Sequence, residues 1–85
     1  MDTRHLSAVL AVARFGSFTE ASRKLFVAQS TLSRQIAAVE RAVGGPLFVR
    51  GARKVRLTTR GEAFLPAAED VLAVVARAEQ AARNA

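Results

Sequence analysis

The sequence predicts a mainly α-helical domain, with three helices and a two-stranded β wing followed by a long C-terminal helix. Three observations predict it. Residues 3–43 contain three apolar patterns at helical spacing, each followed by a turn signal. Residues 47–58 contain two short alternating runs around a basic turn. Residues 59–85 repeat apolar positions in steps of four and three. A chain of 85 residues, 51% of them hydrophobic, can form one small domain with a core.

The first two helices are expected over residues 3–14 and from Ser17 to about Leu25. Gly16 lies between them, where glycine commonly follows the end of a helix. Ser17 and Glu20 are three residues apart and match a capping box at the start of the second helix. The faces predicted to be buried are Leu6, Val9, Leu10 and Ala13 in the first helix, and Phe18, Ala21, Ser22 and Leu25 in the second.

The third helix is expected from about Gln29 to Val43, after a tight connection over residues 26–28 and before Gly44-Gly45-Pro46. Its predicted buried stripe is Leu32, Ile36, Val39 and Val43. The opposite side begins with small polar residues, and the stretch VAQSTLSRQI (27–36) contains no acid. A face that only had to be solvated would normally carry Glu and Lys, which favour helix more than Ser and Thr do. This face therefore indicates either a function or a solvated, weakly capped start of the helix.

Two strands are expected on either side of the turn Gly51-Ala52-Arg53-Lys54, in LFVR (47–50) and VRLT (55–58). The alternation places Val55 and Leu57 on one side of the hairpin and Arg56 on the other. The turn carries Arg53 and Lys54, so the tip of the hairpin is strongly basic. An exposed turn that happens to be basic is the alternative interpretation of these two residues.

The last helix is expected over residues 59–85, capped by Thr59 with Glu62 or by Thr58, with Pro66 inside it. Its apolar residues form a heptad seam that either packs on its own domain or pairs with a second copy of the chain. The length of the helix beyond a small body favours the second copy. The chain then divides into a helix-turn-helix unit, residues 1–58, and a dimerisation helix, residues 59–85. The seam residues are Phe64, Ala68, Val71, Val75, Ala78 and Ala82.

The positive charge is concentrated in the middle of the chain. The net charge is +6, and ten of the 13 Lys and Arg residues lie in residues 14–60, where the acids are Glu20 and Glu40. The remaining residues hold three Arg and five acids. This distribution indicates a polyanionic partner for the body of the domain. Composition alone is equally compatible with a basic surface that maintains solubility.

The sequence does not predict an enzyme, a cofactor or a metal site. There is no cysteine, His5 is the single histidine and lies in no recognisable catalytic motif, and no glycine-rich phosphate loop is present. The acids Asp2, Glu69 and Asp70 lack metal-ligand spacing.

No signal peptide and no apolar run of ~20 residues is found, so we expect a cytoplasmic, nucleoid-associated protein without a membrane segment.

The order helix, short helix, tight turn, helix and basic hairpin is that of a winged helix-turn-helix. In this fold we expect the helix over residues 29–43 to enter the major groove of DNA. We expect the basic tip of the wing, residues 51–56, to enter the adjacent minor groove or to lie along phosphates. Gln pairs with adenine, Arg with guanine, and Ser with several base edges or with phosphate. The candidate DNA-binding residues are Gln29, Ser30, Ser33 and Arg34 on the helix, Arg53 and Lys54 in the wing, and Arg4 for the DNA backbone.

The segments FGSFTEAS (15–22), KLFVAQSTLSRQI (24–36), VERAVGGPLFVR (39–50) and VRLTTRGEAFL (55–65) resemble the N-terminal DNA-binding domain of LysR-type transcriptional regulators. Molybdate-responsive regulators have a similar domain. The resemblance implies DNA-reading positions at Gln29, Ser30, Thr31, Ser33 and Arg34, with Arg53 in the wing. It also implies that residues 59–85 form a linker helix that pairs antiparallel in a homodimer. A complete member continues into an effector domain, so this chain is expected to be a fragment, and a small-molecule effector is expected only for that missing domain.

The sequence departs from the family pattern at four positions. Ala28 replaces a frequent serine cap, Ser30 a frequent proline, Phe26 a common polar residue and Val49 a common glutamate. We expect the first two to influence the base preference.

The leading hypothesis is sequence-specific binding of double-stranded DNA by a homodimer at an interrupted palindromic operator, for transcriptional regulation. A protein-interaction module would place acids or large apolar residues on the 29–37 face, and the sequence has neither there. Nonspecific nucleoid or RNA binding needs exposed stacking aromatics. The five phenylalanines lie mostly at core-type positions, and the chain has no Tyr or Trp.

Overall fold

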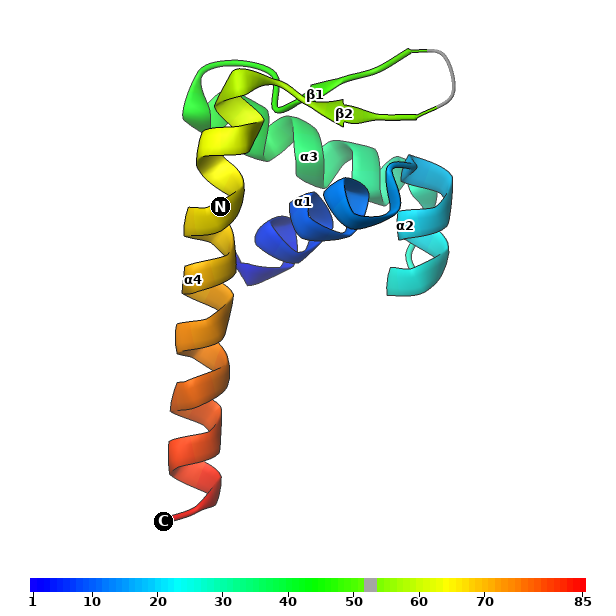
Figure 1. The fold of residues 1–85 in the computed structure, drawn as a ribbon. Coiled ribbons are helices and arrows are strands. Elements are labelled where there is room, and N and C mark those ends of the chain that lie inside the picture. The colour runs from blue at the N-terminus through cyan, green and yellow to red at the C-terminus, as the bar shows by residue number, and fades with distance from the viewer. Residues whose placement is uncertain (52–53) are drawn as a thin grey trace.

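The computed structural model describes residues 1–51 and 54–85, in which a helical body carries one long projecting helix (Figure 1). The elements are α1 (Thr3–Phe15), α2 (Phe18–Leu25), α3 (Gln29–Val43), β1 (Phe48–Val49), β2 (Arg56–Leu57) and α4 (Thr59–Arg83). This order confirms the predicted fold class. The domain measures 49 × 26 × 18 Å because α4 continues well past the body (Figure 1). Within the described residues, the helices are too short or too polar to cross a membrane.

The core forms where the apolar faces of α1, α2 and α3 meet. The predicted stripe of α3 is confirmed, with Val43 half-buried against the core. In α1 the buried face includes Val12, and Leu10 and Ala13 of the predicted stripe are only partly buried. Burial of branched aliphatic side chains is the main stabilising contribution in a domain of this size. The largest fully buried side chains are Leu32, Ile36, Leu47, Val9, Val12 and Val39.

The ends of α1 and α2 follow local sequence signals. Gly16 ends α1 with φ +63°, a left-handed conformation that favours glycine. The Ser17 hydroxyl accepts a hydrogen bond from the Glu20 N–H at 3.1 Å. The predicted capping box is only half formed, because the Glu20 carboxylate lies 3.5 Å from the Arg23 guanidinium instead of returning to the Ser17 N–H. An ion pair one helical turn away therefore replaces the second bond of the box.

The start of α4 is capped by Thr58. Its hydroxyl accepts a hydrogen bond from the Gly61 N–H at 3.0 Å and donates to the Pro46 carbonyl at 2.8 Å. Of the two expected caps, Thr58 is therefore correct, and Thr59 with Glu62 is wrong because Thr59 already lies in the helix.

Polar contacts join the end of α3, the hairpin and the start of α4. The Glu40 carboxylate accepts a hydrogen bond from the Leu47 N–H at 2.8 Å, and the Leu47 carbonyl accepts one from the Thr58 N–H at 2.9 Å. The Arg60 guanidinium donates to the Val43 carbonyl at 2.8 Å, which satisfies a carbonyl at the C-terminus of α3. The direction of α4 is therefore fixed relative to α3.

The wing is a short antiparallel hairpin. Phe48 pairs with Leu57 and Val49 with Arg56. Val55 and Leu57 pack against the core and Arg56 is exposed, as the alternation predicted. The hairpin is anchored by an edge-to-face contact between the rings of Phe48 and Phe18, whose centroids are 6.1 Å apart.

Asp2 begins α1 with a capping box that the sequence analysis did not predict. Its carboxylate accepts hydrogen bonds from the N–H groups of Arg4 and His5, and the Asp2 N–H donates to His5 Nδ1 at 3.1 Å. The Arg4 guanidinium also donates to this carboxylate at 3.1 Å. The Arg4 side-chain hydrogen bond, followed by the His5 N–H, lowers the pKa of Asp2 from 3.8 to about 2. The single histidine therefore has a structural partner.

The lowered pKa of Asp2 predicts a pH-dependent contribution to stability. A carboxyl whose pKa is lower in the folded state stabilises the fold above its unfolded pKa, and this contribution is lost as the pH falls through the folded value. Asp2→Asn is therefore expected to lower the midpoint of thermal unfolding at pH 7. The difference from the parent should disappear between about pH 4 and pH 2, measured by circular dichroism. A difference that stays constant over this range would contradict a role for the charge.

Candidate nucleic-acid interface

The first half of α3 presents Gln29, Ser30, Ser33 and Arg34, which we call the N-terminal face of α3. Gln29, Ser30 and Arg34 are exposed, and Ser33 is partly exposed. The opposite side of the same helix is fixed in the core by its buried stripe. A helix fixed in the core therefore carries polar side chains into solvent, and the small Ser30 and Ser33 allow another molecule to approach its backbone closely. Thr31 is partly exposed at the flank of this face, 3.5 Å from the Arg34 guanidinium.

A tight turn sets the angle between α2 and α3. Phe26 adopts a left-handed conformation with φ +56°, and its side chain is 95% exposed. The Val27 N–H donates to the Ser22 carbonyl at 3.0 Å, which closes the turn. A left-handed conformation costs a non-glycine residue roughly 1–2 kcal/mol. Here the backbone hydrogen bonds of the turn stabilise it. Ala28 then precedes α3 in an extended conformation, and its methyl group cannot cap the helix.

The single acid of α3, Glu40, lies away from the N-terminal face of α3. Its side chain is 18% exposed and accepts the hydrogen bond from the Leu47 N–H. The Arg50 guanidinium lies 3.8 Å from the same carboxylate and 4.5 Å from the centre of the Phe18 ring. Glu40 therefore stabilises the segment that leads into the hairpin, and its negative charge is compensated by Arg50.

The basic residues of the wing are described in part. Arg53 lies outside the described residues. The stem of the exposed Lys54 lies against Gly16, and the Val55 N–H donates to the Gly16 carbonyl at 3.0 Å. The second strand of the wing is thus attached to the turn between α1 and α2. Figure 1 shows that the hairpin extends toward the end of the body at which α2 lies and α3 begins.

The residues of the seam predicted along α4 lie in two different environments. Phe64 packs against the core and Ala68 is buried, so the domain itself covers the start of the seam. Farther along, Val71 is 46% exposed and Val75 is partly exposed. Val74, which the heptad pattern did not include, is 52% exposed. Beyond them, Ala78 and Ala82 are exposed on the part of α4 that projects from the body (Figure 1).

The sequence of the chain matches the model of one known protein family. The model of bacterial regulatory helix-turn-helix proteins of the LysR family matches residues 3–62. The chain belongs to the LysR family. It is a helix-turn-helix DNA-binding domain of a transcriptional regulator and not an enzyme.

Similar proteins include full-length regulators. The chain is 48% identical over 81 residues to the Hca operon transcriptional activator HcaR of Escherichia coli (strain K12), in an alignment that covers 95% of this chain and 26% of HcaR. This LysR-type chain therefore spans about a quarter of the length of that relative.

Similar solved structures include DNA complexes. The structure of the CbnR DNA-binding domain with DNA matches with a TM-score of 0.92 and 34% identity, over 99% of this chain and 97% of that chain. The complex of the BenM DNA-binding domain with benA site 1 DNA matches with a TM-score of 0.92 and 38% identity, over 99% and 94% of the two chains. The LysR-type domain therefore has the backbone of domains that have been solved on DNA.

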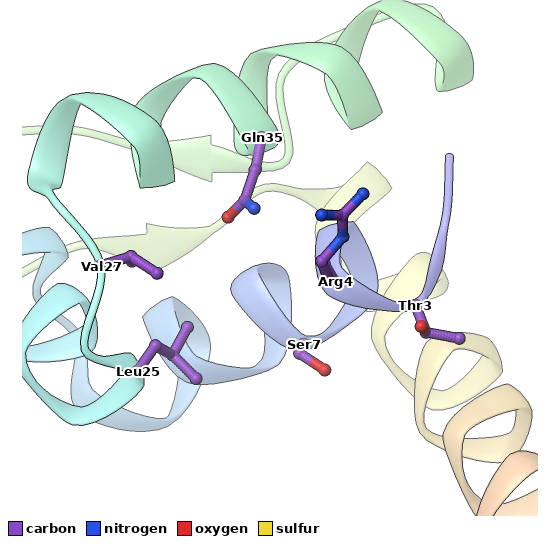
Figure 2. Close-up of a pocket in the computed structure, with 6 residues that line it drawn as sticks. All are labelled: Thr3, Arg4, Ser7, Leu25, Val27 and Gln35. Carbon is purple, nitrogen blue, oxygen red and sulfur yellow. The ribbon is translucent and has the colours of Figure 1, made fainter.

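Arg4 lies apart from the N-terminal face of α3. It lines a groove of about 310 Å³ between α1, the turn after α2 and the flank of α3, with Leu25, Val27 and Gln35 among the other lining residues. Figure 2 shows Arg4 from α1 and Gln35 from α3 on two sides of this groove. The Arg4 guanidinium is exposed and paired with Asp2, so it can exchange that partner for a phosphate.

Sequence reasoning missed one side-chain contact at the N-terminal face of α3. Thr19, in the first turn of α2, donates a hydrogen bond from its hydroxyl to Gln29 Oε1 at 3.2 Å. Both residues are exposed and ten positions apart in the sequence. Periodicity within one helix cannot reveal such a pair, because it depends on how α2 and α3 are placed relative to each other.

Proposed function

We propose that this LysR-type domain recognises a specific double-stranded DNA sequence, with α3 inserted into the major groove by its first two turns. The observation that carries the proposal is the N-terminal face of α3, which is largely exposed, polar and without acids, on a helix whose other side is fixed in the core. An acidic residue on that face would repel phosphate. The small Ser30 and Ser33 let the helix backbone approach the DNA, and the longer Gln29 and Arg34 can then reach base edges.

The residue types of this face suggest distinct roles. Gln29 can pair with adenine through one donor and one acceptor, and Arg34 can pair bidentately with guanine. Ser30 and Ser33 can contact base edges or phosphates, and their size allows close approach of the helix. Thr31, at the flank, can contact a sugar or a phosphate. The free N–H groups at the start of α3 add a favourable dipole toward phosphate.

The wing and scattered arginines supply contacts to the DNA backbone in this proposal. Lys54 and Arg56 are exposed on the hairpin. Arg53 lies between the described parts of the chain and is proposed for the flanking minor groove from its place in the sequence. Arg4 is proposed for a phosphate beside α1. Such contacts position the protein on DNA and make its affinity depend on salt.

We also propose that the domain works as a homodimer through α4. The supporting observation is the exposed apolar stripe at Val71, Val74 and Val75, on a helix that projects from the body. Residues 1–58 then read DNA, and the part of residues 59–85 beyond Ala68 pairs with the second copy. A two-fold dimer places two recognition helices on two half-sites, which corresponds to an interrupted palindromic operator.

Response to a small-molecule effector would belong to the additional length that relatives such as HcaR have.

Gln29→Ala tests the proposed reading of bases. A preferred site is first selected from a random DNA library by salt-dependent binding and sequencing. At that site, the variant is expected to lose about 1–3 kcal/mol of discrimination at one base pair in each half-site, because one bidentate contact is removed. Binding is measured by fluorescence anisotropy on the selected site and on single-base variants of it.

Gln35→Ala is the matched control for Gln29→Ala. It removes the same side chain from the same helix, at the groove beside Arg4 rather than on the N-terminal face of α3. The control should retain the base preference of the parent. If Gln29→Ala discriminated between selected and scrambled DNA as well as the parent does, α3 would not be the reading helix in the proposed way.

A further inference from the structure

Thr19 is the residue of α2 that reaches the side chain at the start of α3. Its hydroxyl donates to Gln29 Oε1 at 3.2 Å, across the turn that separates the two helices. Both side chains are exposed, so the contact lies on the surface that the proposed function turns toward DNA. The contact therefore acts on a side chain that remains available to another molecule.

The backbone of Thr19 is held firmly. The Ser17 hydroxyl caps the first turn of α2, and the buried Ser22 hydroxyl donates to the Thr19 carbonyl at 2.8 Å. Threonine is branched at Cβ, and this restricts rotation about χ1. The Thr19 side chain therefore has fewer accessible conformations than the longer glutamine that it contacts.

The contact with Thr19 leaves Gln29 with the donor and the acceptor that pairing with adenine requires. A carbonyl oxygen accepts two hydrogen bonds, so the bond from Thr19 leaves one acceptor position on Oε1 and both donors on Nε2. Adenine offers one acceptor and one donor in the major groove. A glutamine already ordered by Thr19 loses less conformational freedom when it pairs with a base.

We propose that Thr19 is a positioning residue that orders Gln29 for base recognition and so contributes to base selectivity without touching the base. The inference rests on the proposed function, in which Gln29 reads a base. The competing role for this hydroxyl is a direct contact with phosphate, which would carry no sequence information.

The test uses Thr19→Val, which removes the hydroxyl and keeps the size and branching of the side chain. Affinities are measured on the selected site and on a site changed at the base pair that Gln29→Ala identifies. The variant is expected to lose about three- to fivefold of the discrimination at that base pair, the loss typical of one neutral hydrogen bond. Affinity for scrambled DNA and the salt dependence should be unchanged, and Thr19→Ser should restore the discrimination.

The double variant Thr19→Val/Gln29→Ala should discriminate no worse than Gln29→Ala alone, because Thr19 acts through Gln29. A uniform loss on all DNA sequences together with a smaller salt slope would show a phosphate contact and overturn the inference. Full discrimination by Thr19→Val, in a protein whose Gln29→Ala variant has lost it, would also overturn the inference and leave the proposed function intact. Full discrimination by Gln29→Ala itself would refute the proposed function.

Discussion

Replacing Gly61 with alanine is expected to destabilise the domain by about 3 kcal/mol, near the upper end of the usual cost of an overpacked site. In an open helix the same substitution would stabilise by about 1 kcal/mol. Here Gly61 is buried in the first turn of α4, and a Cβ would overlap the Leu47 carbonyl oxygen and lie 2.9 Å from Leu57 Cδ2. The Leu47 peptide cannot move away cheaply, because its N–H is bonded to Glu40 and its carbonyl to the Thr58 N–H.

Urea unfolding of the parent, Gly61→Ala and Gly51→Ala measures this effect. Gly51 is the matched control because a Cβ there meets no described atom within 4 Å. Its alanine variant should stay within about 0.5 kcal/mol of the parent. Equal or greater stability of Gly61→Ala would mean that α4 does not start as close to Leu47 as the structure shows.

Replacing Val71 with aspartate is expected to abolish the proposed dimer and to weaken binding to a complete operator about 100-fold. The single side chain is 46% exposed, so a charge there is tolerated in the separate domain. In a helix pair the same charge would be buried without a partner, which is strongly unfavourable. Loss of the second domain removes the gain from simultaneous binding of two half-sites, which commonly amounts to about 10²–10⁴-fold.

Sedimentation velocity gives the oligomeric state, and anisotropy with full and half operators gives the affinity. Ala73→Asp is the matched control, because residue 73 is exposed and lies on the opposite side of α4 from Val71. The Val71→Asp variant should bind a half operator as the parent does. A dimer of unchanged stability would show that the chain pairs through another surface.

Much of the fold could be predicted because its boundaries carry local signals. Gly16 and Gly44 adopt positive φ where a helix ends, and Ser17 caps the following helix. The observed bounds of α3 agree with the prediction because a clear apolar stripe and the Gly44-Gly45-Pro46 segment define it. The N-terminal face of α3 was also predicted, since the core stripe leaves these residues on the outer side.

The remaining features depend on contacts between segments that are distant in the sequence. The choice of Thr58 as the cap of α4 depends on the Pro46 carbonyl, and the Thr19–Gln29 contact depends on the angle between two helices. Heptad spacing identified one face of α4 and could not show that the body covers Phe64 and Ala68. Likewise, a phenylalanine gives no local signal for the left-handed conformation that the turn requires of Phe26.

The bond from Arg60 to the Val43 carbonyl has a mechanical consequence. Together with the contacts of Leu47, it connects the end of α3 to the first turn of α4. In the proposed dimer, each α4 connects the helix pair to the body that carries α3. A small rotation where the two helices cross is carried to the DNA end as a displacement of the whole body. In such a dimer, the distance between half-sites would be set far from the bases, by the angle at which the two α4 helices cross.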